Sequence, residues 1–345
     1  MADSEISAFL LSELDAHGAG VIGRAVRKLG ISRQAVLKRL NALVDQGDVE
    51  AQGRTRGRRY RLRRNVVLET RVDLRGLEED VVYREQIRPV LGNIPDNIQR
   101  ICQYGFTEIL NNAIDHSLSD KAVIEISLTR SVIDMAIRDF GVGIFRKIRD
   151  ALALADEKDC LVFLSKGKTT TDEARHSGQG IFFTSRLFDY FSLLSGHLLF
   201  WHRRTSDEWS SKDQPSNHRG TAVRMWISTY SLTRIKDVFD RYATPERDYS
   251  FSRTQVPVAL AQHEDEGLVS RSQAKRLLAR FDQFEEIVLD FKGVESIGQA
   301  FADEIFRVFR RLQPAIRIRW INDNEQVAAM IQRATDQLIR ELQQG

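Results

Sequence analysis

The spacing of apolar residues divides the chain into three parts. In the first part they recur at helical spacing in three segments, residues 4–18, 21–30 and 31–49. Beyond residue 49, apolar and polar residues alternate on both sides of a glycine-rich turn, which is typical of a β-hairpin. The first part, residues 1–64, is therefore predicted to hold three helices and two strands.

One long helix dominates the start of the second part, after a charged stretch at residues 65–92. Helical spacing runs from Pro95 to about Ser117. Because a helical residue advances about 100°, several polar side chains share one face, while apolar neighbours are left to pack the other. The polar residues of this helix are Glu108, Asn111, Asn112, Asp115 and His116, and the apolar neighbours are Ile109, Leu110, Ala113 and Ile114.

Strands and two glycine turns complete the second part. Four apolar segments have strand-like patterns, at residues 122–128, 132–139, 191–201 and 220–227. The first glycine turn, DFGVGI, follows the second of these strands, and the second turn, SGQGI, opens a helix. A long polar segment separates the two turns.

The third part alternates regularly between strands and helices. Strands are predicted within residues 249–261, 285–294 and 315–322, and helices within 270–284, within 296–312 and from about Glu325 onward. Alternation of this size indicates a compact sheet flanked by helices.

Composition is that of an ordinary globular protein. The chain has 345 residues, of which 42% are hydrophobic and 29% charged, with only 6 prolines, which fits two or three domains without long disordered tracts. Cys102 and Cys160 are too few and too far apart for a disulfide framework or a zinc site. The first residues are acidic where a signal peptide is basic, and no apolar run approaches the roughly 18 residues of a membrane span. We therefore predict a cytoplasmic protein without membrane contact.

Positive charge is concentrated in the first part. Residues 1–64 contain 13 Lys and Arg against 7 Asp and Glu, although the net charge of the whole chain is only +3. Seven of these arginines lie between Arg54 and Arg64. Such an asymmetry indicates an anionic partner for this part.

Three helices followed by a basic hairpin resemble a winged helix-turn-helix domain. The resemblance implies that the third helix enters the major groove of DNA and that the wing contacts phosphates or a minor groove. The alternative is a winged helix for protein interaction, whose charges are merely solvated. The implied nucleic-acid-binding residues are Ser32, Arg33, Gln34, Lys38 and Arg39 on the third helix and Arg54, Arg56, Arg58 and Arg59 on the wing.

Four elements of the second part occur in a recognisable order: the helix with the polar face, DFGVGI, SGQGI and then GTAV. In this order, with fitting strands between them, they resemble the GHKL superfamily, which includes gyrase, MutL and sensor histidine kinases. The resemblance spans about residues 80–230. It implies an ATP-binding α/β sandwich, the Bergerat fold, in which the polar helix face meets a nucleotide and Mg²⁺.

The resemblance gives roles to the residues that match the family pattern. Asn112 matches the asparagine that ligates Mg²⁺, and Glu108 matches the carboxylate that activates or positions the attacking water. Asp139 matches the acceptor for the adenine amino group, while Gly141 and Gly143 match glycines that let the backbone approach the base.

Further cofactor-binding residues are implied around these. The second glycine turn suits phosphate because its amides and the following helix N-terminus point at an anion. Residues of about 144–177 match the ATP lid, in which cationic and hydroxyl groups would reach the γ-phosphate; the alternative is a loop with no nucleotide role. The implied residues are Asn111, Asp115, Gly178, Gln179, Gly180, Ile181 and Thr221 at the site and Lys166, Lys168, Thr169, Thr170 and Thr171 in the lid.

The third part resembles the STAS-like family that is related to anti-sigma-factor antagonists, through the segment IVLDFKGVESIGQAFADEIFRVF. In the antagonists, a serine after the strand is phosphorylated by a GHKL kinase. Ala300 stands at that position here, and Ser296 lies four residues earlier. The resemblance therefore favours a docking or oligomerisation module over a phosphorylation switch.

The sequence as a whole predicts an α+β multidomain protein. Its predicted domains are a winged helix at 1–64, a GHKL ATP-binding domain at 65–247 and a STAS-like α/β domain at 248–345. The predicted function is a Mg²⁺-dependent ATPase switch that couples its nucleotide state to binding of DNA and of a protein partner or a second copy. The alternatives are a GHKL-type serine or histidine kinase and a non-hydrolysing, ATP-sensing transcription regulator.

Overall fold

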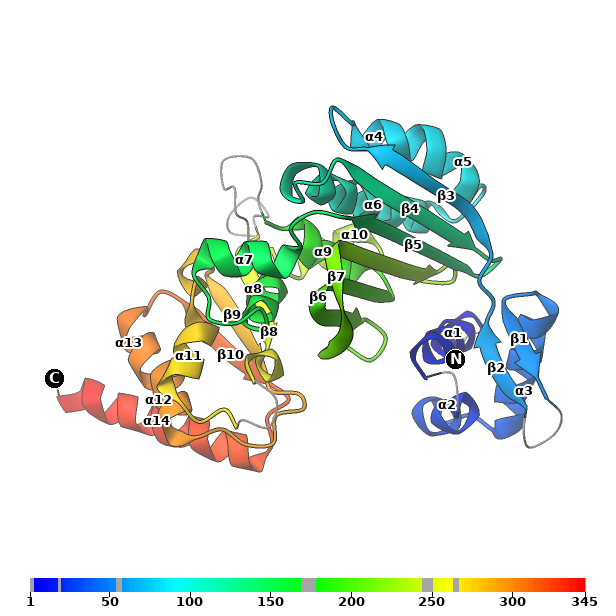
Figure 1. Cartoon of the computed structure of the whole chain (residues 1–345). Coiled ribbons are helices and arrows are strands. Elements are labelled where there is room, and N and C mark those ends of the chain that lie inside the picture. The colour runs from blue at the N-terminus through cyan, green and yellow to red at the C-terminus, as the bar shows by residue number, and fades with distance from the viewer. Residues whose placement is uncertain are drawn as a thin grey trace. The chain divides into compact units, whose positions relative to one another are not determined.

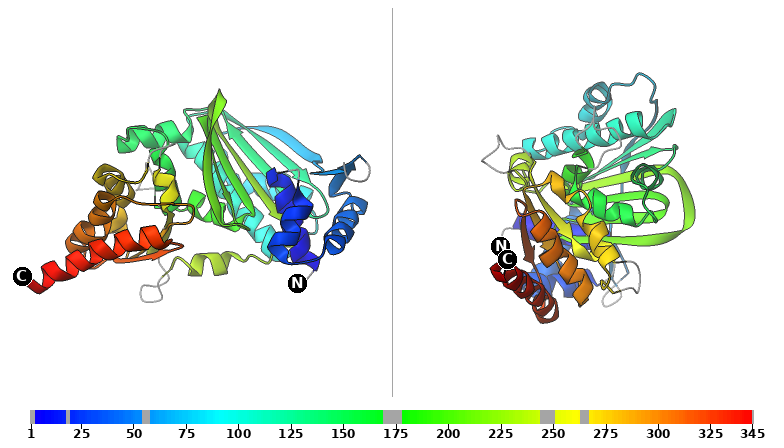
Figure 2. Two further views of the ribbon diagram at one scale, coloured as in Figure 1. Left: turned by 90° about the horizontal axis from the view of Figure 1, so that it is seen from below. Right: turned by 90° about the vertical axis from the view of Figure 1, so that its left-hand side faces the viewer.

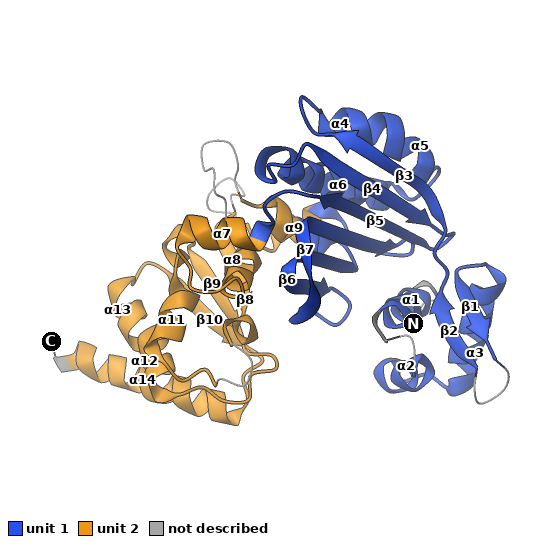
Figure 3. Ribbon diagram, in the orientation of Figure 1, with its two compact units in different colours: residues 1–144, 184–235 blue, residues 145–183, 236–345 orange. Residues whose placement is uncertain are grey.

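The protein is described here by a computed structural model covering residues 3–17, 20–53, 58–168, 178–243, 251–262 and 267–344. The chain divides into two compact units (Figure 3). Unit 1 comprises residues 1–144 and 184–235, and unit 2 comprises residues 145–183 and 236–345. The units cut across the predicted domain ranges, because most of the predicted lid groups with the C-terminal part of the chain.

Unit 1 begins with the three helices and the hairpin that the sequence predicted, which we call the N-terminal module. Gly30, in the left-handed conformation, ends the second helix with its N–H donated to the Val26 carbonyl, and the Ser32 hydroxyl accepts the Ala35 N–H at the start of the third. The elements are α1 (Asp3–His17), α2 (Val21–Leu29), α3 (Arg33–Asp45), β1 (Val49–Gln52) and β2 (Arg59–Leu62) (Figure 1).

A five-stranded antiparallel sheet forms the rest of unit 1, in the order β3-β4-β5-β7-β6. Its strands are β3 (Val66–Asp73), β4 (Lys121–Leu128), β5 (Val132–Asp139), β6 (Tyr190–Arg203) and β7 (Glu208–Ser228). The four predicted strands are present, and the last two form one extended hairpin in which β7, with 21 residues, begins well before the predicted segment 220–227.

Helices cover one face of this sheet (Figures 1 and 2). The predicted long helix is α6 (Asp96–His116), and its Ile109 and Leu110 are buried. The helix lies so close that a Cβ on Gly105 would stand 2.3 Å from the Phe188 ring. The preceding stretch, which the sequence left without structure, contains α4 (Glu79–Val82), a π-helical turn (Tyr83–Ile87) and α5 (Arg88–Leu91).

The N-terminal module packs on the other face of the sheet. One continuous apolar cluster joins module residues such as Leu10 and Leu40 to Val132, Tyr190 and Trp226 of the sheet. Val132 and Trp226 belong to the strand face opposite α6, because side chains alternate along each strand. The module and the sheet therefore share a core.

Unit 2 is built on a three-stranded parallel sheet in the order β10-β9-β8. The predicted alternation of strands and helices is confirmed here, with α8 added beside β8. Its elements are α7 (Ile144–Leu152), α8 (Asp159–Lys166), the shared helix α9 (Gly180–Leu187), α10 (Ile235–Asp240), β8 (Arg253–Pro257), α11 (Arg271–Leu278), β9 (Glu286–Asp290), α12 (Gln299–Asp303) with its π-helical and α-helical continuations (Glu304–Phe309; α13, Arg310–Leu312), β10 (Arg317–Ile321) and α14 (Glu325–Gln344), besides 3₁₀ turns at Val258–Ala261 and Phe281–Gln283.

Candidate functional site

The polar face of α6 stands on a buried apolar base. Ile109, Leu110 and Ala113 are at most 4% exposed, whereas Glu108 and Asn112 are half-buried. Asn111 is also half-buried and Asp115 is exposed. The helix thus holds its carboxylates and amides outward from a fixed support, as the sequence predicted.

Tyr104 lies one turn before Glu108 and was not singled out in the sequence. Burial raises the pKa of the Tyr104 hydroxyl, and the charge and hydrogen bond of the Glu108 carboxylate raise it further. The phenol therefore stays protonated and donates to Glu108, which fixes the direction of that carboxylate. The helical spacing of four residues was the available signal for this pair.

Asp139 ends β5 and organises the first glycine turn. Its carboxylate is 5% exposed, and Oδ1 accepts the backbone N–H groups of Gly141 at 2.9 Å and of Thr221 at 3.2 Å. Burial raises the pKa of Asp139, and these hydrogen bonds oppose the rise. The Thr221 hydroxyl in turn accepts the N–H of Ile144 at 3.0 Å. The structure therefore brings together Asp139, the first glycine turn and Thr221.

Close backbone contacts explain the glycines around Asp139. A Cβ on Gly141 would lie 1.8 Å from the Ser117 carbonyl oxygen, and one on Gly220 would lie 2.3 Å from that of Asp139. Gly143 has a φ of 83°, and a Cβ there would lie 2.5 Å from the Ser195 hydroxyl. Any side chain at these positions would displace the turn.

The glycine turn is also tied to the end of α6. The Val142 N–H donates to the Ser117 carbonyl at 2.9 Å, directly after the last helical residue. This bond couples the polar helix to the turn after Asp139. In unit 1, the end of α6 and the turn after Asp139 are therefore joined by a backbone hydrogen bond.

The second glycine turn lies in unit 2, at and just before the start of α9. Its Gly178 has a φ of 66°, so the turn needs glycine there. Gln179, Gly180 and Ile181 are half-buried. The phosphate role of these four residues stays a prediction.

The two lid lysines have structural partners inside unit 2. Lys166 is 1% exposed, and its ammonium donates to the carbonyls of Arg276 (3.4 Å) and Ala279 (2.9 Å). Burial lowers its pKa to about 7. Lys168 donates to the Gln283 carbonyl at 2.7 Å. The expectation that these ammonium groups are free to reach a phosphate does not fit this arrangement.

The predicted lid threonines, Thr169, Thr170 and Thr171, lie outside the described residues.

The predicted nucleic-acid residues of the N-terminal module are mostly accessible. Arg33, Gln34 and Lys38 on α3 are exposed, as are Arg58 and Arg59 at the start of β2. Arg54 and Arg56 lie outside the described residues.

Arg39 departs from this pattern. Its side chain is 16% exposed, contacts Asp3 and Ser7, and lies over the Tyr230 ring. Arg39 therefore helps to hold the module together and to the sheet rather than facing outward.

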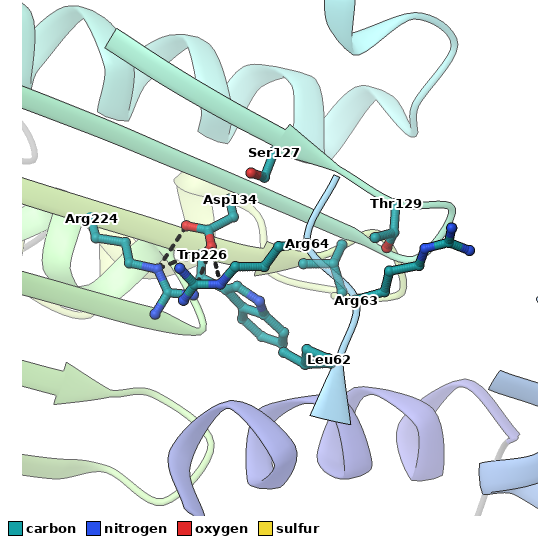
Figure 4. A pocket seen from close by; sticks show the side chains of 9 residues that line it. Leu62, Arg63, Arg64, Ser127, Thr129, Asp134, Arg224 and Trp226 are labelled. Carbon is teal, nitrogen blue, oxygen red and sulfur yellow. Dashed lines mark hydrogen bonds and ion pairs between the residues drawn. The ribbon is translucent and has the colours of Figure 1, made fainter. Parts of the chain in front are cut away.

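Arg224 on β7 contacts Asp134 within the sheet (Figure 4) and Asp15 of the N-terminal module. Its guanidinium donates to both carboxylate oxygens of Asp134 on β5, at 2.7 to 3.0 Å, and to Asp15 on α1, at 2.9 and 3.5 Å. Both carboxylates are almost buried, with side chains 11% and 6% exposed. The pKa of Arg224 is raised, because these partners outweigh its burial. We call these three residues the Arg224 clamp.

A second buried contact lies nearby. The Asp48 carboxylate, fully buried after α3, accepts the N–H and hydroxyl of Ser131 in the turn before β5, and Ser131 also bonds Tyr230. A small pocket beside the clamp holds three buried polar atoms without a partner in the described structure: Ser127 Oγ, Thr129 Oγ1 and Trp226 Nε1. Its volume of about 10 Å³ is room for about one water molecule.

Comparison with known proteins identifies one region. A search of the curated proteins finds no match. None of the helices in the described ranges is long and apolar enough to cross a membrane. Residues 273–328 match the family "STAS-like domain of unknown function (DUF4325)". These residues run from α11 into α14 and include β9 and β10. The C-terminal part of the chain thus carries a STAS-like domain, as the sequence predicted.

Proposed function

We propose that this protein is a Mg²⁺-dependent ATPase of the GHKL type, in which the nucleotide state controls how the N-terminal module, a winged helix, binds DNA. The observation that carries the proposal is the arrangement of β5 and β7. The same two strands hold Asp139 and Thr221 at one end and, further along, Asp134 and Arg224 of the Arg224 clamp.

The proposed binding of the nucleotide rests on polar groups of unit 1. Asp139 offers a buried carboxylate whose position is fixed by two backbone N–H groups. An acceptor of this kind favours adenine, whose exocyclic amine donates, over guanine, whose O6 accepts. The glycine turn beside it is packed against backbone, with no space for a Cβ at Gly141 or Gly220, and this packing keeps the Asp139 carboxylate in place.

The polar face of α6 supplies the groups for hydrolysis. Glu108, oriented by Tyr104, is placed to take a proton or a hydrogen bond from an attacking water. Asn112, one turn further on the half-buried face, offers an amide oxygen, the ligand type that suits a hard cation. Asn112 would hold the ion together with phosphate oxygens of the nucleotide. When bound, Mg²⁺ would neutralise charge on the phosphates during their transfer.

The nucleic-acid end of the proposal rests on the accessible basic residues of α3 and β2. The module docks on the sheet through α1 and the loop after α3, which leaves Arg33, Gln34 and Lys38 exposed. A helix N-terminal half with this composition suits the major groove. DNA binding would then not require the module to leave the sheet.

The clamp gives the coupling a physical route. Asp134 and Asp139 are five residues apart on β5, or about 17 Å at the rise of a strand. They lie on opposite faces of the sheet. A shift of β5 against β7 at the nucleotide end would therefore alter the hydrogen bonds of Arg224, which cross the two strands and reach α1.

The test follows γ-labelled ATP with Mg²⁺ in the wild type, Glu108→Ala and Glu85→Ala, with and without duplex DNA. Glu85 is an exposed carboxylate outside the site (64% exposed) and serves as the matched control. Phosphate release by the wild type and the control, and its loss by about 100-fold or more in Glu108→Ala, would support the hydrolase. Label on the protein instead would favour a kinase. Normal turnover in Glu108→Ala would remove this residue from the mechanism.

A further inference from the structure

A row of arginines surrounds one carboxylate on the sheet of unit 2. Arg253 on β8 and Arg317 on β10 are both register partners of Glu286 on the central strand β9. The three residues therefore share one face of the sheet, and Arg319, two residues further along β10, points to the same face.

The ion pairs of this cluster are incomplete. Glu286 is almost buried, and its carboxylate oxygens lie 3.4 Å from Arg253, 3.6 Å from Arg317 and 3.4 Å from Arg319. Oε1 has no partner with hydrogen-bond geometry in the described structure. The guanidiniums surround the carboxylate without forming the paired bonds that would use their donors.

The cluster carries an excess of positive charge. Three guanidiniums face one carboxylate, which leaves a surplus of two positive charges on a small area. Each guanidinium has five N–H donors, so the three together carry many more donors than the roughly four acceptor sites of one carboxylate. The arginine side chains are 38% to 66% exposed, so the remaining donors face solvent.

The adjoining edge of the sheet is open. Within the described residues, β10 pairs on one side only, with β9. The Arg317 N–H and the Ile321 carbonyl face β9, so the backbone groups of the alternate residues, Ile318 and Trp320, face outward. Arginines on an edge strand discourage pairing with unsuitable strands. Arg253 lies on β8, at the opposite edge of the described sheet, so it does not protect the edge of β10.

The charges along this edge of the sheet favour one class of binding partner over others. A second copy pairing edge to edge in the antiparallel sense about Arg319 would set Arg319 against Arg319, which is unfavourable. A long polyanion such as DNA laid along the edge would pass from Arg317 and Arg319 to the exposed Asp323 and Glu325. A short acidic segment avoids both conflicts.

We propose that this surface, Arg253, Arg317 and Arg319 with the open edge of β10, binds an extended acidic segment of a partner protein. The segment adds a strand beside β10 and places its carboxylates on the arginines. This interaction gives the STAS-like domain a partner of defined chemistry and does not depend on ATP or DNA binding.

The test uses the full chain and a short fluorescein-labelled peptide that alternates glutamate and valine, followed by fluorescence anisotropy. A peptide alternating lysine and valine is the charge control. The double variant R317Q/R319Q is compared with R333Q/R340Q, which removes the same charge from exposed positions on α14. We expect the acidic peptide to bind roughly 3- to 30-fold more weakly to R317Q/R319Q, and about equally to the wild type and R333Q/R340Q.

A change of opposite sign gives an independent check. Glu286→Gln raises the surplus from two to three positive charges, so the acidic peptide should bind more tightly to it than to the wild type. Thermal melts establish that each variant is folded. Equal binding by all variants, or equal loss in the two double variants, would overturn the proposal. A loss for duplex DNA but not for the peptide in R317Q/R319Q would assign the surface to nucleic acid and overturn it as well.

Discussion

Removing the guanidinium of the Arg224 clamp gives the sharpest test of how the N-terminal module is held. Arg224→Leu would leave Asp15 and Asp134, both nearly buried, facing each other without their shared cation. Leucine also cannot replace the hydrogen bonds that join β7 to β5 and to α1. Arg224→Leu should therefore lower the free energy of unfolding, because two desolvated negative charges lose the cation that they share.

The expected loss follows from burial. Breaking a buried ion pair by removing one partner costs about 3–5 kcal/mol, and the Arg224 side chain is only 22% exposed, so solvent screens it weakly. Two longer contacts remain, Arg203 with Asp15 at 3.8 Å and Arg64 with Asp134 at 4.0 Å. These two contacts bring the expected loss of stability closer to about 3 kcal/mol. A loss of that size lowers the urea midpoint by about 1 M or more.

The assay is urea denaturation of the full chain in a Trp320→Phe background. This change leaves the three tryptophans of unit 1 as fluorescent probes, and one of them, Trp226, lines the pocket beside the clamp. The control is Arg84→Leu, because Arg84 pairs with Asp80 on an exposed helix surface and should change stability by no more than about 0.5 kcal/mol.

A neutral version of the clamp tests the explanation itself. Arg224→Leu combined with Asp15→Asn and Asp134→Asn removes all three charges, and we expect it to recover at least about half of the loss. A triple variant as unstable as Arg224→Leu alone would show that shape and packing, not uncompensated charge, account for the effect. A loss in Arg224→Leu no larger than in the Arg84 control would refute the clamp as a stabilising contact.

Three further predictions concern the candidate site and unit 2. Tyr104→Phe removes the hydrogen bond that orients Glu108, so phosphate release should fall roughly 10-fold while calorimetry finds ATP affinity within about twofold of the wild type. Gly220→Ala would place a Cβ 2.3 Å from the Asp139 backbone, so ATP affinity measured by calorimetry should fall about 10-fold or more. Burial lowers the pKa of Lys166 to about 7, below its value of about 10.4 in the unfolded chain, so the unfolded state binds more protons between these values. Stability should therefore rise by up to about 1.4 kcal/mol per pH unit from pH 7 toward 10 in the wild type, and urea titrations of Lys166→Met should lack this slope.

The elements that the sequence predicted well are those whose limits are set locally. Pro95 precedes α6 because its ring suits the residue before a helix, and the helix ends where the Ser117 N–H and hydroxyl both return to the Ala113 carbonyl. The polar and apolar faces of α6 follow from the same spacing. Asp139 and its glycine turn could likewise be located by pattern alone, although their assignment to a nucleotide came from the resemblance.

The elements that the sequence missed depend on distant residues. β3 is an edge strand with only Val72 buried, so it has little alternation to read, and its pairing with β4 is set by residues more than forty positions away. The sequence assigned Lys166 to the ATP lid and Arg39 to the DNA-binding helix, because both are basic residues in those segments. Their surroundings come instead from remote segments, such as the ring of Tyr230 over Arg39. A local pattern carries no information about such contacts.

The segment between the two glycine turns also has a position that distant residues determine. The sequence presented a lid and a separate C-terminal module, yet residues 145–168 fold as part of unit 2. Lys166 holds the carbonyls at the end of α11, the Thr254 hydroxyl on β8 donates to the Lys166 carbonyl at 2.7 Å, and Asp159 pairs with Arg276 at 3.1 Å. These contacts join α8 to both the sheet and a helix of the STAS-like part. The described part of the predicted lid, residues 145–168, therefore belongs to the same compact unit as the STAS-like domain, which no local pattern in the sequence indicated.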